Sequence, residues 1–552
     1  MAFWHRITRK WAIPVWAGAT GSFLMTAAVS TYIQWRPLFR DPDSFYHMKM
    51  AVLLLRDGIV WNFPWLPFTV LSDHFADHHF LYHVLLTPFI AAFGPENGML
   101  IATATLCGAA MAAFYVVLRE YQVRFPSFFV FLLITSQGFA FRFNLAKATG
   151  ASLLTIMLAL LAIRRRNYLA LFLLAWAYVL LYGGWPIIAG IVGIALLSRI
   201  VADRLVERHP IHSWAHLWFW RRLFRGSQQA RQDFFLLPEI RAAVATVAGI
   251  VCGIVINPYF PRNLQFYWQQ IYQIALVGYR GRLNVGVEWF PATRGEMIGY
   301  AGGPIIFLLA VVGLVIIAAA WGDIIFKKRE HGADEFSALF ASAVLTLVFM
   351  CLTLRSKRNV EYFLPFLVLF EALFAKIVFS GINFRRLYGN IIVHAGQTIL
   401  VSVVAAFTVV FLALNGVRDV SVIRGSYGDG ISWNRYAGVS SWLREHVPAG
   451  SVIYHSEWDD FPVLFWRDDR YRYISGLDPA FLFLKSPSLY DAYYDVSTGR
   501  TGLGASNIIM NTFGAKYVVI KKGYMGMQRA VAKYGGATLE YQDDDGWIYS
   551  LQ

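Results

Sequence analysis

A series of long apolar runs, most of them without a charged side chain, constrains this chain more than any other feature. About 20 apolar residues are the length that a helix needs to cross the hydrocarbon core of a bilayer. About eleven such runs are predicted, some short enough to require tilted helices. They cover residues 11–33, 97–118, 126–141, 149–165, 167–184, 185–201, 239–257, 303–322, 335–354, 360–379 and 395–415. The sequence therefore predicts a mostly α-helical, polytopic membrane domain with about 11 to 13 transmembrane helices.

The composition excludes a soluble enzyme: 57% of the 552 residues are hydrophobic and the mean hydropathy is +0.48. The net charge of +15 does not indicate nucleic-acid binding, because most of the surplus lies in short loops between the runs. The basic loops contain Arg119 and Arg124, Arg164 to Arg166, residues 204–231, Lys327 to Arg329, and Arg385 with Arg386. The positive-inside rule places these loops and the basic N-terminus in the cytoplasm. We expect a multi-pass protein of a prokaryotic inner or plasma membrane.

The three cysteines, Cys107, Cys252 and Cys351, all lie within apolar runs. This placement predicts neither a disulfide framework nor a thiol metal site. The long cytoplasmic loop mixes Trp214, Trp218 and Trp220 with arginines, which is typical of a helix lying in the membrane surface.

Three substantial segments fall outside the membrane: residues 34–96, residues 258–302 and the chain after 415. We therefore divide the chain into a membrane domain, residues 1–415, and a soluble extracytoplasmic domain, residues 416–552. The latter is predicted to be a small α/β domain, with a helix over Trp433–Val447 and strands at Ser451–Tyr454, Tyr471–Ile474, Tyr517–Ile520 and Trp547–Leu551. Leu81–Gly94 is apolar but too short to span, which predicts a re-entrant or interfacial helix.

Ionisable residues crowd the point where the first apolar run ends, in the stretch Arg40–Lys49. It contains Asp41, Asp43 and His47 beside cations. Ionisable groups at the membrane edge are costly and for that reason indicate a functional site. The alternative is an interfacial loop whose charged side chains snorkel towards water.

A second cluster lies at Asp73–His83, where six ligand-type side chains occur in one short run. In a helix, Asp73 and Asp77 would share a face, as would His74 with His78 and His79 with His83. Carboxylates and imidazoles at this spacing bind divalent cations, so the run and Asp43 are predicted to form a metal or phosphate site. A hydrated, pH-sensitive surface turn is the alternative.

Two further external segments carry charged residues. The first contains Glu288, and the second contains Arg355, Lys357 and Arg358. Three outward cations break the positive-inside pattern and indicate an anion ligand, with arginine the better clamp for phosphate. Contact with outer-leaflet headgroups is the alternative. In the soluble domain, Trp458, Asp459 and Asp460 directly follow a predicted strand, where α/β folds often place sites.

Taken together, these motifs resemble the catalytic subunit of oligosaccharyltransferases, within the GT-C class of membrane glycosyltransferases. Asp41–His47, Asp-Pro-Asp-Ser-Phe-Tyr-His, resembles the first acidic motif of that family, and Asp43 matches its metal ligand. Glu288 in Val285–Glu288 resembles the glutamate of the long external loop, which helps to bind metal and acceptor. Arg358, ahead of Tyr362, resembles the arginine that faces the lipid-linked phosphate.

The sequence departs from that family at two motifs. The second acidic pair is expected after the run at 126–141, but Arg142–Thr149 contains no acid. Only Trp458 and Asp459 of Glu457–Phe461 match the acceptor motif, so recognition of a protein acceptor is an open question.

The resemblance implies transfer of a sugar or oligosaccharide from a polyprenyl phosphate or diphosphate carrier to an acceptor outside the cytoplasm. The acceptor is a protein or another envelope glycan or lipid. Asp43, Glu288 and Arg358 would be catalytic, and Mg²⁺ or Mn²⁺ would be the cofactor. The predicted metal ligands are Asp43, Asp73, Asp77, His74, His78 and Glu288; the phosphate ligands are Arg355, Lys357 and Arg358; and the acceptor contacts are Trp458, Asp459 and Asp460. A transporter of lipid-linked sugars or a non-catalytic assembly subunit is the alternative, favoured by the missing acidic pair.

Overall fold

The computed structural model describes residues 13–206, 238–320, 333–381, 395–533 and 536–552. The basic N-terminus and most of the tryptophan-rich loop, including its predicted surface helix, lie outside the described residues.

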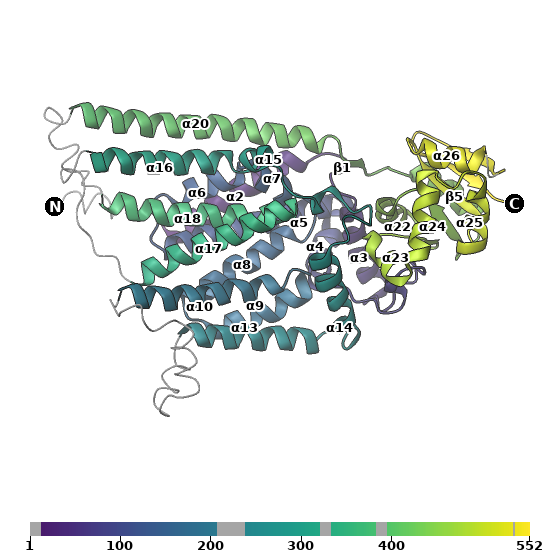
Figure 1. Ribbon diagram of the computed structural model, residues 1–552, viewed down its shortest axis with the longest axis horizontal. Helices are drawn as coiled ribbons and strands as arrows, with labels where there is room; N and C mark the ends of the chain where they lie inside the picture. Colours follow the sequence, from purple (N-terminus) through teal and green to yellow (C-terminus); the bar gives the residue numbers. More distant parts are fainter. Residues whose placement is uncertain (1–12, 207–237, 321–332, 382–394, 534–535) are drawn as a thin grey trace, which may run out of the picture.

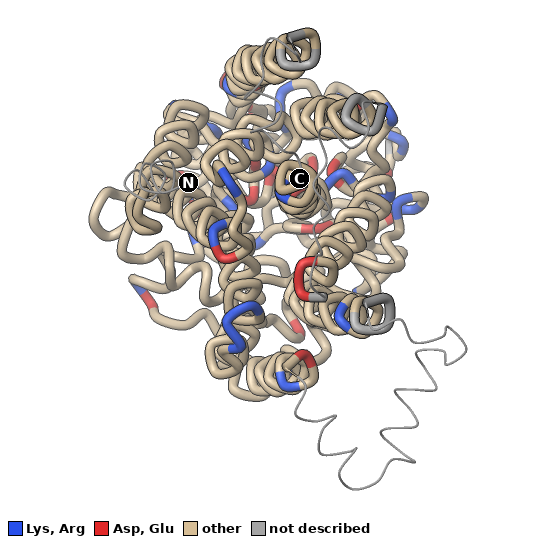
Figure 2. Tube along the Cα trace, turned by 90° about the vertical axis from the view of Figure 1, so that its left-hand side faces the viewer, with Lys and Arg blue, Asp and Glu red and all other residues tan. Residues whose placement is uncertain are grey.

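Twelve helices of the described residues form a bundle whose long members run side by side in Figure 1, with α20 and α13 at opposite edges. They are α2 (Val15–Gln34), α5 (Pro95–Glu120), α6 (Pro126–Ile134), α7 (Gln137–Phe143), α8 (Thr149–Arg164), α9 (Tyr168–Leu181), α10 (Pro186–Val206), α13 (Pro238–Val255), α16 (Gly302–Ala320), α17 (Ala333–Arg355), α18 (Val360–Gly381) and α20 (Ala395–Tyr427). Figure 2 views the bundle from the end opposite the C-terminal sheet and shows Lys and Arg on several of its helices.

Among the described residues, five helices are long and apolar enough to cross a membrane. The number rises to seven if each of two helix pairs bent by 77°, α6 with α7 and α15 (Arg294–Tyr300) with α16, is one span. Four more apolar helices are shorter, among them α8 and α9. These findings support an integral membrane protein and leave the predicted count of 11 to 13 as a prediction.

Close helix packing in the bundle depends on glycine where α13 meets α9. Gly249 and Gly253 are four residues apart, and a Cβ atom at Gly253 would lie 2.7 Å from the Cβ of Val179. A Cβ atom at Gly249 would overlap the carbonyl oxygen of Phe172. This small-xxx-small pattern lets two backbones approach closely, as in membrane helix pairs generally.

The first and second external segments lie between the bundle and the C-terminal sheet (Figure 1). The first contains β1 (Leu38–Phe39), α3 (Asp43–Asp57), η1 (Val70–Ser72) and α4 (Phe80–Phe93). The second contains α14 (Arg262–Tyr267), a π-helical segment η3 (Trp268–Val277), η4 (Val287–Trp289) and α15. The apolar helix expected at 81–94 is therefore present as α4.

The C-terminal residues form a five-stranded mixed sheet with strand order β4-β3-β5-β7-β6. Its strands are β3 (Val452–His455), β4 (Arg472–Tyr473), β5 (Tyr517–Lys521), β6 (Thr538–Gln542) and β7 (Gly546–Ser550). Both β4 and β5 pair with β3 in parallel, and β7 pairs antiparallel with β5 and β6. The helices around the sheet are α21 (Ala437–His446), α22 (Phe461–Arg467), α23 (Pro479–Lys485), α24 (Pro487–Thr498), α25 (Ala505–Phe513) and α26 (Met525–Ala532), together with the short turns η7 (Trp458–Asp460) and η8 (Gly502–Gly504). The four predicted strands all occur, whereas β6 is an additional edge strand.

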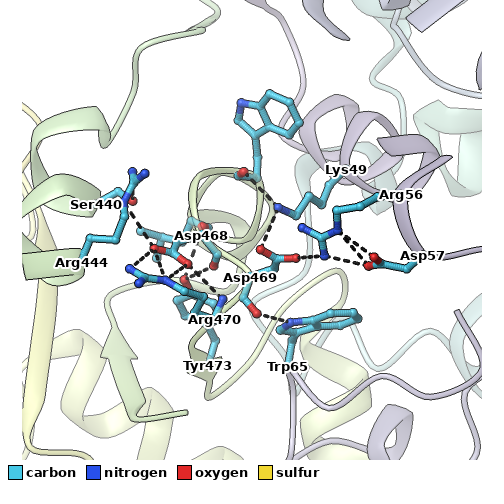
Figure 3. Close-up of polar contacts among 12 residues, drawn as sticks. Lys49, Arg56, Asp57, Trp65, Ser440, Arg444, Asp468, Asp469, Arg470 and Tyr473 are labelled. Atoms are coloured by element: carbon cyan, nitrogen blue, oxygen red, sulfur yellow. Dashed lines mark hydrogen bonds and ion pairs between the residues drawn. The ribbon is translucent and has the colours of Figure 1, made fainter. Parts of the chain in front are cut away.

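A charged latch fastens this sheet to α3 (Figure 3). Asp469 accepts from Lys49, at 3.3 Å, and from Arg56, at 2.7 Å. The backbone carbonyl of Asp469 also accepts a 2.7 Å hydrogen bond from the Trp65 indole. Because Lys49 is buried, its ammonium group needs this carboxylate partner. The strand pair of β1 with β2 (Ile431–Ser432) forms a second junction between the two halves.

Asp469→Asn leaves the buried Lys49 ammonium without its carboxylate, so we expect a loss of on the order of 2 kcal/mol in stability. The readout is a lower apparent melting temperature and faster proteolysis of the C-terminal residues in detergent. The control is Asp57→Asn, an exposed partner of Arg56, which should leave both nearly unchanged. Equal behaviour of the two variants would refute the latch.

Candidate active site

Asp43 begins α3, and its backbone N–H donates to Oδ1 of Asp41 at 2.9 Å. The ammonium group of Lys147 lies between the two side chains, 2.9 Å from Asp41 Oδ1 and 2.8 Å from Asp43 Oδ2. Burial raises the pKa of Asp43, and the positive charge of Lys147 opposes that rise. The same two carboxylates hold the pKa of Lys147 above its ordinary value despite burial. The three groups form one charged cluster.

Arg142, near the end of α7, forms a second cluster of the same kind. Its Nη1 lies 2.8 Å from Glu288 Oε2, and its Nε lies 3.1 Å from Glu361 Oε2. Arg142 and Lys147 thus both come from the segment in which the family resemblance calls for an acidic pair. Here two cations from that segment bind carboxylates from other segments.

Glu288 lies in η4 and is fixed by backbone contacts to the segment that follows α17. Ser356 Oγ donates to the carbonyl of Glu288 at 2.9 Å, and the N–H of Lys357 donates to the carbonyl of Phe290 at 3.0 Å. Burial raises the pKa of Glu288, but Arg142, Lys147 and Arg358 together lower it far below its ordinary value. Glu288 is therefore an anion at neutral pH.

Arg358 lies in η6 (Lys357–Asn359) on the other side of Glu288. Its Nη1 is 3.8 Å from Glu288 Oε1, and its Nη2 donates to the hydroxyl of Tyr182 at 3.1 Å. The guanidinium group also lies over the ring of Trp289, 5.3 Å from its centre. These contacts hold Arg358 in one orientation, with its side chain still about 31% exposed.

A cavity of about 430 Å³ adjoins Arg358. Arg280, Arg355 and Arg358 line it, as do His78 and His79. Most of its remaining wall is apolar and comes from α10, η3 and α17: Ile187, Ile191, Ile194, Ile271, Ala275, Leu276, Leu345, Val348, Phe349 and Leu352. A cavity with arginines on an otherwise apolar wall suits a ligand that joins an anionic group to a hydrocarbon chain.

Of the three predicted phosphate ligands, Arg355 and Arg358 line this cavity. Lys357 does not; its ammonium group lies 2.5 Å from Glu296 Oε1. Arg355 also donates to the carbonyl of Leu276, and its own carbonyl accepts from Arg280 at 2.5 Å. Two of the three cations, Arg355 and Arg358, therefore line the cavity, and the third, Lys357, forms an ion pair outside it.

The expected helical pairing in Asp73–His83 is wrong, because residues 73–79 are not helical and α4 begins only at Phe80. Asp73 pairs with Lys485, and His74 contacts Gln269 at 3.3 Å. Asp77 accepts from His83 at 2.6 Å, and His83 in turn contacts His47 of α3 at 2.9 Å. The buried part of this cluster holds α3 against α4.

The structure does not bring the six predicted metal ligands together. Asp43 and Glu288 are bound to Lys147 and Arg142, while Asp73 and Asp77 have the separate partners just described. His78 stacks near His79 on the cavity wall. Within the described ranges, no group of three or more His, Cys, Asp or Glu side chains is arranged to hold a metal ion. The donor set does not fit the divalent cation that the resemblance implies.

The predicted acceptor residues lie where the C-terminal sheet meets the second external segment. Trp458 Nε1 donates to the carbonyl of Asn284 at 2.9 Å, four residues before Glu288. Asp460 accepts from the hydroxyl of Tyr436 at 2.8 Å, and Lys521 lies 3.6 Å from it. Burial raises the pKa of Asp459 to about 8. Trp458 therefore contacts the segment that carries Glu288, whereas Asp460 is bound within the C-terminal half by Tyr436 and Lys521.

Sequence reasoning missed several charged groups of this site, namely Arg142, Lys147, Glu361 and Asp478, and gave no separate role to Asp41. Asp478 caps α23 through a 2.8 Å bond from the N–H of Ala480, and burial raises its pKa to about 7. The charges of Asp43, Arg358 and Glu288 also act on this pKa. A signal was available for Arg142 and Lys147, since cations on the outer side of an apolar run break the positive-inside pattern.

No family model and no curated protein matches this chain. Solved structures do. The chain resembles the apo oligosaccharyltransferase of Archaeoglobus fulgidus, with a TM-score of 0.57 and 14% identity over 97% of this chain and 74% of that one. It also resembles ArnT of Cupriavidus metallidurans bound to undecaprenyl phosphate, with a TM-score of 0.55 and 13% identity over 96% and 97% of the two chains. The mycobacterial arabinofuranosyltransferase AftD matches with a TM-score of 0.54 and 11% identity, over 97% of this chain and 40% of that one.

All three are glycosyltransferases of the GT-C class. This chain has the GT-C fold. The predicted resemblance is thereby confirmed at the level of the fold, across nearly the whole chain.

Arg142→Met leaves Glu288 and Glu361 without the cation between them. We expect a loss of on the order of 3 kcal/mol, seen as a lower apparent melting temperature, because the buried Glu361 loses its ion-pair partner, which is strongly unfavourable, whereas the half-buried Glu288 keeps Arg358 nearby. Adding Glu361→Gln to that variant should recover part of the loss. The control is Arg165→Met, which breaks an exposed pair with Glu120 and should change little. An unchanged melting temperature in Arg142→Met would contradict this account.

Proposed function

We propose that this protein is a membrane glycosyltransferase that moves a sugar or oligosaccharide from a polyprenyl-phosphate-type carrier to an acceptor. One observation carries the proposal: in a GT-C fold, an apolar cavity with Arg355 and Arg358 on its wall adjoins Glu288. The ArnT structure supports the carrier class, since that protein is bound to undecaprenyl phosphate.

In this proposal the cavity holds the carrier. The apolar side chains of α10, η3 and α17 contact the hydrocarbon chain, and Arg358 with Arg355 binds the phosphate. As the bond from the anomeric carbon to the phosphate oxygen breaks, negative charge grows on that oxygen. Preoriented guanidinium groups stabilise such charge without reorganising during the reaction. The contacts of Arg358 with Tyr182 and Trp289 support this role.

Asp43 is the proposed general base. The acceptor hydroxyl or amide forms the new bond to the anomeric carbon, its proton passes to Asp43, and the carrier leaves as polyprenyl phosphate or diphosphate. Lys147 and the hydrogen bond to Asp41 hold the Asp43 side chain in place for this transfer. Glu288 orients Arg358 and Arg142 through its two oxygens.

We place the reaction at the extracytoplasmic face, with the N-terminus in the cytoplasm and the C-terminal sheet outside. The positive-inside pattern of the basic loops supports this orientation. The charged cluster, the cavity arginines and Trp458 then all lie on the outer side. A separate assay with a peptide as the sole acceptor distinguishes a protein acceptor from another envelope glycan or lipid, since only a protein acceptor predicts modified peptide.

The proposal predicts release of free polyprenyl phosphate or diphosphate when purified protein meets a polyprenyl-linked sugar and a mixed peptide and envelope-glycan acceptor extract. Asp43→Asn should lower that release by about 10³-fold, since it removes the base. Asp57→Asn at the far end of α3 is the control and should keep wild-type release. A transporter or assembly subunit would bind the lipid-linked sugar without releasing the carrier, with or without Asp43.

Arg358→Gln should lower kcat/KM for the carrier-linked donor by about 10²-fold, because it removes one preoriented charge from the leaving phosphate. The matched control is Arg282→Gln, which breaks an ion pair with Asp491 and does not line the cavity. Steady-state release assays over a range of donor concentrations measure both. Equal kinetics for the two variants would remove Arg358 from the phosphate site.

A further inference from the structure

Lys147 is placed where a cation is needed between two carboxylates. Asp41 and Asp43 are two residues apart, and both face the same ammonium group, at 2.9 Å and 2.8 Å. The Lys147 side chain is only 14% exposed, so solvent contributes little to its neutralisation. Two neighbouring carboxylates repel each other unless a positive charge lies between them. Lys147 supplies that charge from within the chain.

The ammonium group of Lys147 opposes the binding of a divalent ion at the same carboxylates. Mg²⁺ and related ions need several oxygen ligands at about 2.0–2.6 Å, and carboxylates are the main protein donors. At this site the carboxylates already enclose Lys147, and a divalent ion beside a lysine ammonium would meet a like charge. Arg142 blocks Glu288 in a similar way, because it lies between Glu288 and Glu361.

Both cations come from the end of α7 and the loop that follows it, Arg142 to Lys147, which contains no acid. This region therefore supplies two cations and no carboxylate to the site. The region has no acidic side chain that could extend a metal site. Its two cations instead neutralise the carboxylates that the rest of the site contains.

We propose that Lys147 serves as the resident cation of this site in place of a divalent metal and acts as a positioning residue for Asp43. This inference rests on the proposed function. It holds that sugar transfer needs no divalent ion, and that Lys147 acts through Asp43 on the chemical step, with no part in binding the carrier.

The first test uses wild-type protein. Release of polyprenyl phosphate should be unchanged after removal of divalent ions with a chelator and after addition of Mg²⁺ or Mn²⁺. In a separate measurement, Mn²⁺ is titrated with the full chain and its binding is followed by electron paramagnetic resonance. The wild-type protein and Asp43→Asn should bind the same amount of Mn²⁺, because Asp43 is not expected to be a ligand. This second readout needs no activity.

The second test uses Lys147 variants. Lys147→Met should lower kcat by about 10²-fold with the KM for the donor within about twofold, because a charge acting on the chemical step is lost. Lys147→Arg keeps the charge and should retain most of the kcat. The matched control is Lys376→Met, which removes another poorly exposed lysine paired with a carboxylate, Glu335, at 2.7 Å. Melting temperatures establish that each variant is folded.

Chelator-sensitive release that Mn²⁺ restores, together with Mn²⁺ binding that depends on Asp43, would overturn this inference and leave the proposed function intact. Equal loss of kcat in Lys147→Met and Lys147→Arg, with both folded, would also overturn it. Absence of release by wild-type protein with every donor would refute the proposed function, and Asp43-dependent Mn²⁺ binding would then separately refute the role of Lys147.

Discussion

The site depends on the neutralisation of four carboxylates by cations that lie between them. Lys147 joins Asp41 to Asp43, and Arg142 joins Glu288 to Glu361. An unpaired carboxylate in such surroundings is strongly unfavourable, so each cation fixes the position of two segments at once. The first external segment, the α7–α8 loop, η4 and the start of α18 therefore hold one another in place through charge. Removal of either cation disturbs all of its neighbours.

Hydrogen bonds to the backbone hold the part of the candidate site that contains Glu288 and Arg358. Hydrogen bonds from Ser356 and Lys357 to the chain around Glu288 tie the second external segment to the turn that carries Arg358. Glu288 and Arg358 consequently form one unit, although 70 residues separate them in sequence. Functional groups are held most accurately when they lie on supports of this kind. The arginine, its carboxylate and the cavity wall share that support.

Local patterns in the sequence predicted a mostly helical bundle and most of the strands of the C-terminal sheet, but not the 77° bend that divides the run at 126–141 into α6 and α7. The buried strands β3 and β5 follow from short runs of β-branched and aromatic residues, such as Tyr517–Lys521. The mostly exposed edge strand β6 has no such pattern, and it was not predicted. The helix predicted from Trp433 begins only at Ala437, because the chain first pairs as β2 and turns.

The candidate site was predictable only in part, because its contacts join residues far apart in the sequence. Asp43, Glu288 and Arg358 were singled out by their charge and position and were given roles by the family resemblance, and Glu288 and Arg358 do lie together. No local pattern shows that Arg142 meets Glu288, or that Asp77 is bound to His83 and so has no free oxygen pair for a shared metal. Spacing identifies ligand-type side chains, whereas their actual partners are decided by tertiary packing.

The C-terminal half of the chain contributes residues next to the candidate site. The segment after β4 contains Leu477, a non-glycine residue with φ of 65°, a conformation that costs about 1 kcal/mol or more. Packing maintains this corner, and the next residue is the half-buried Asp478, whose pKa is influenced by the charges of Asp43, Arg358 and Glu288. Asp469, in the connection before β4, forms an ion pair with Lys49 of α3, the helix that Asp43 begins. The charged groups around the candidate site therefore come from both halves of the chain, with Asp469 and Asp478 supplied by the C-terminal half.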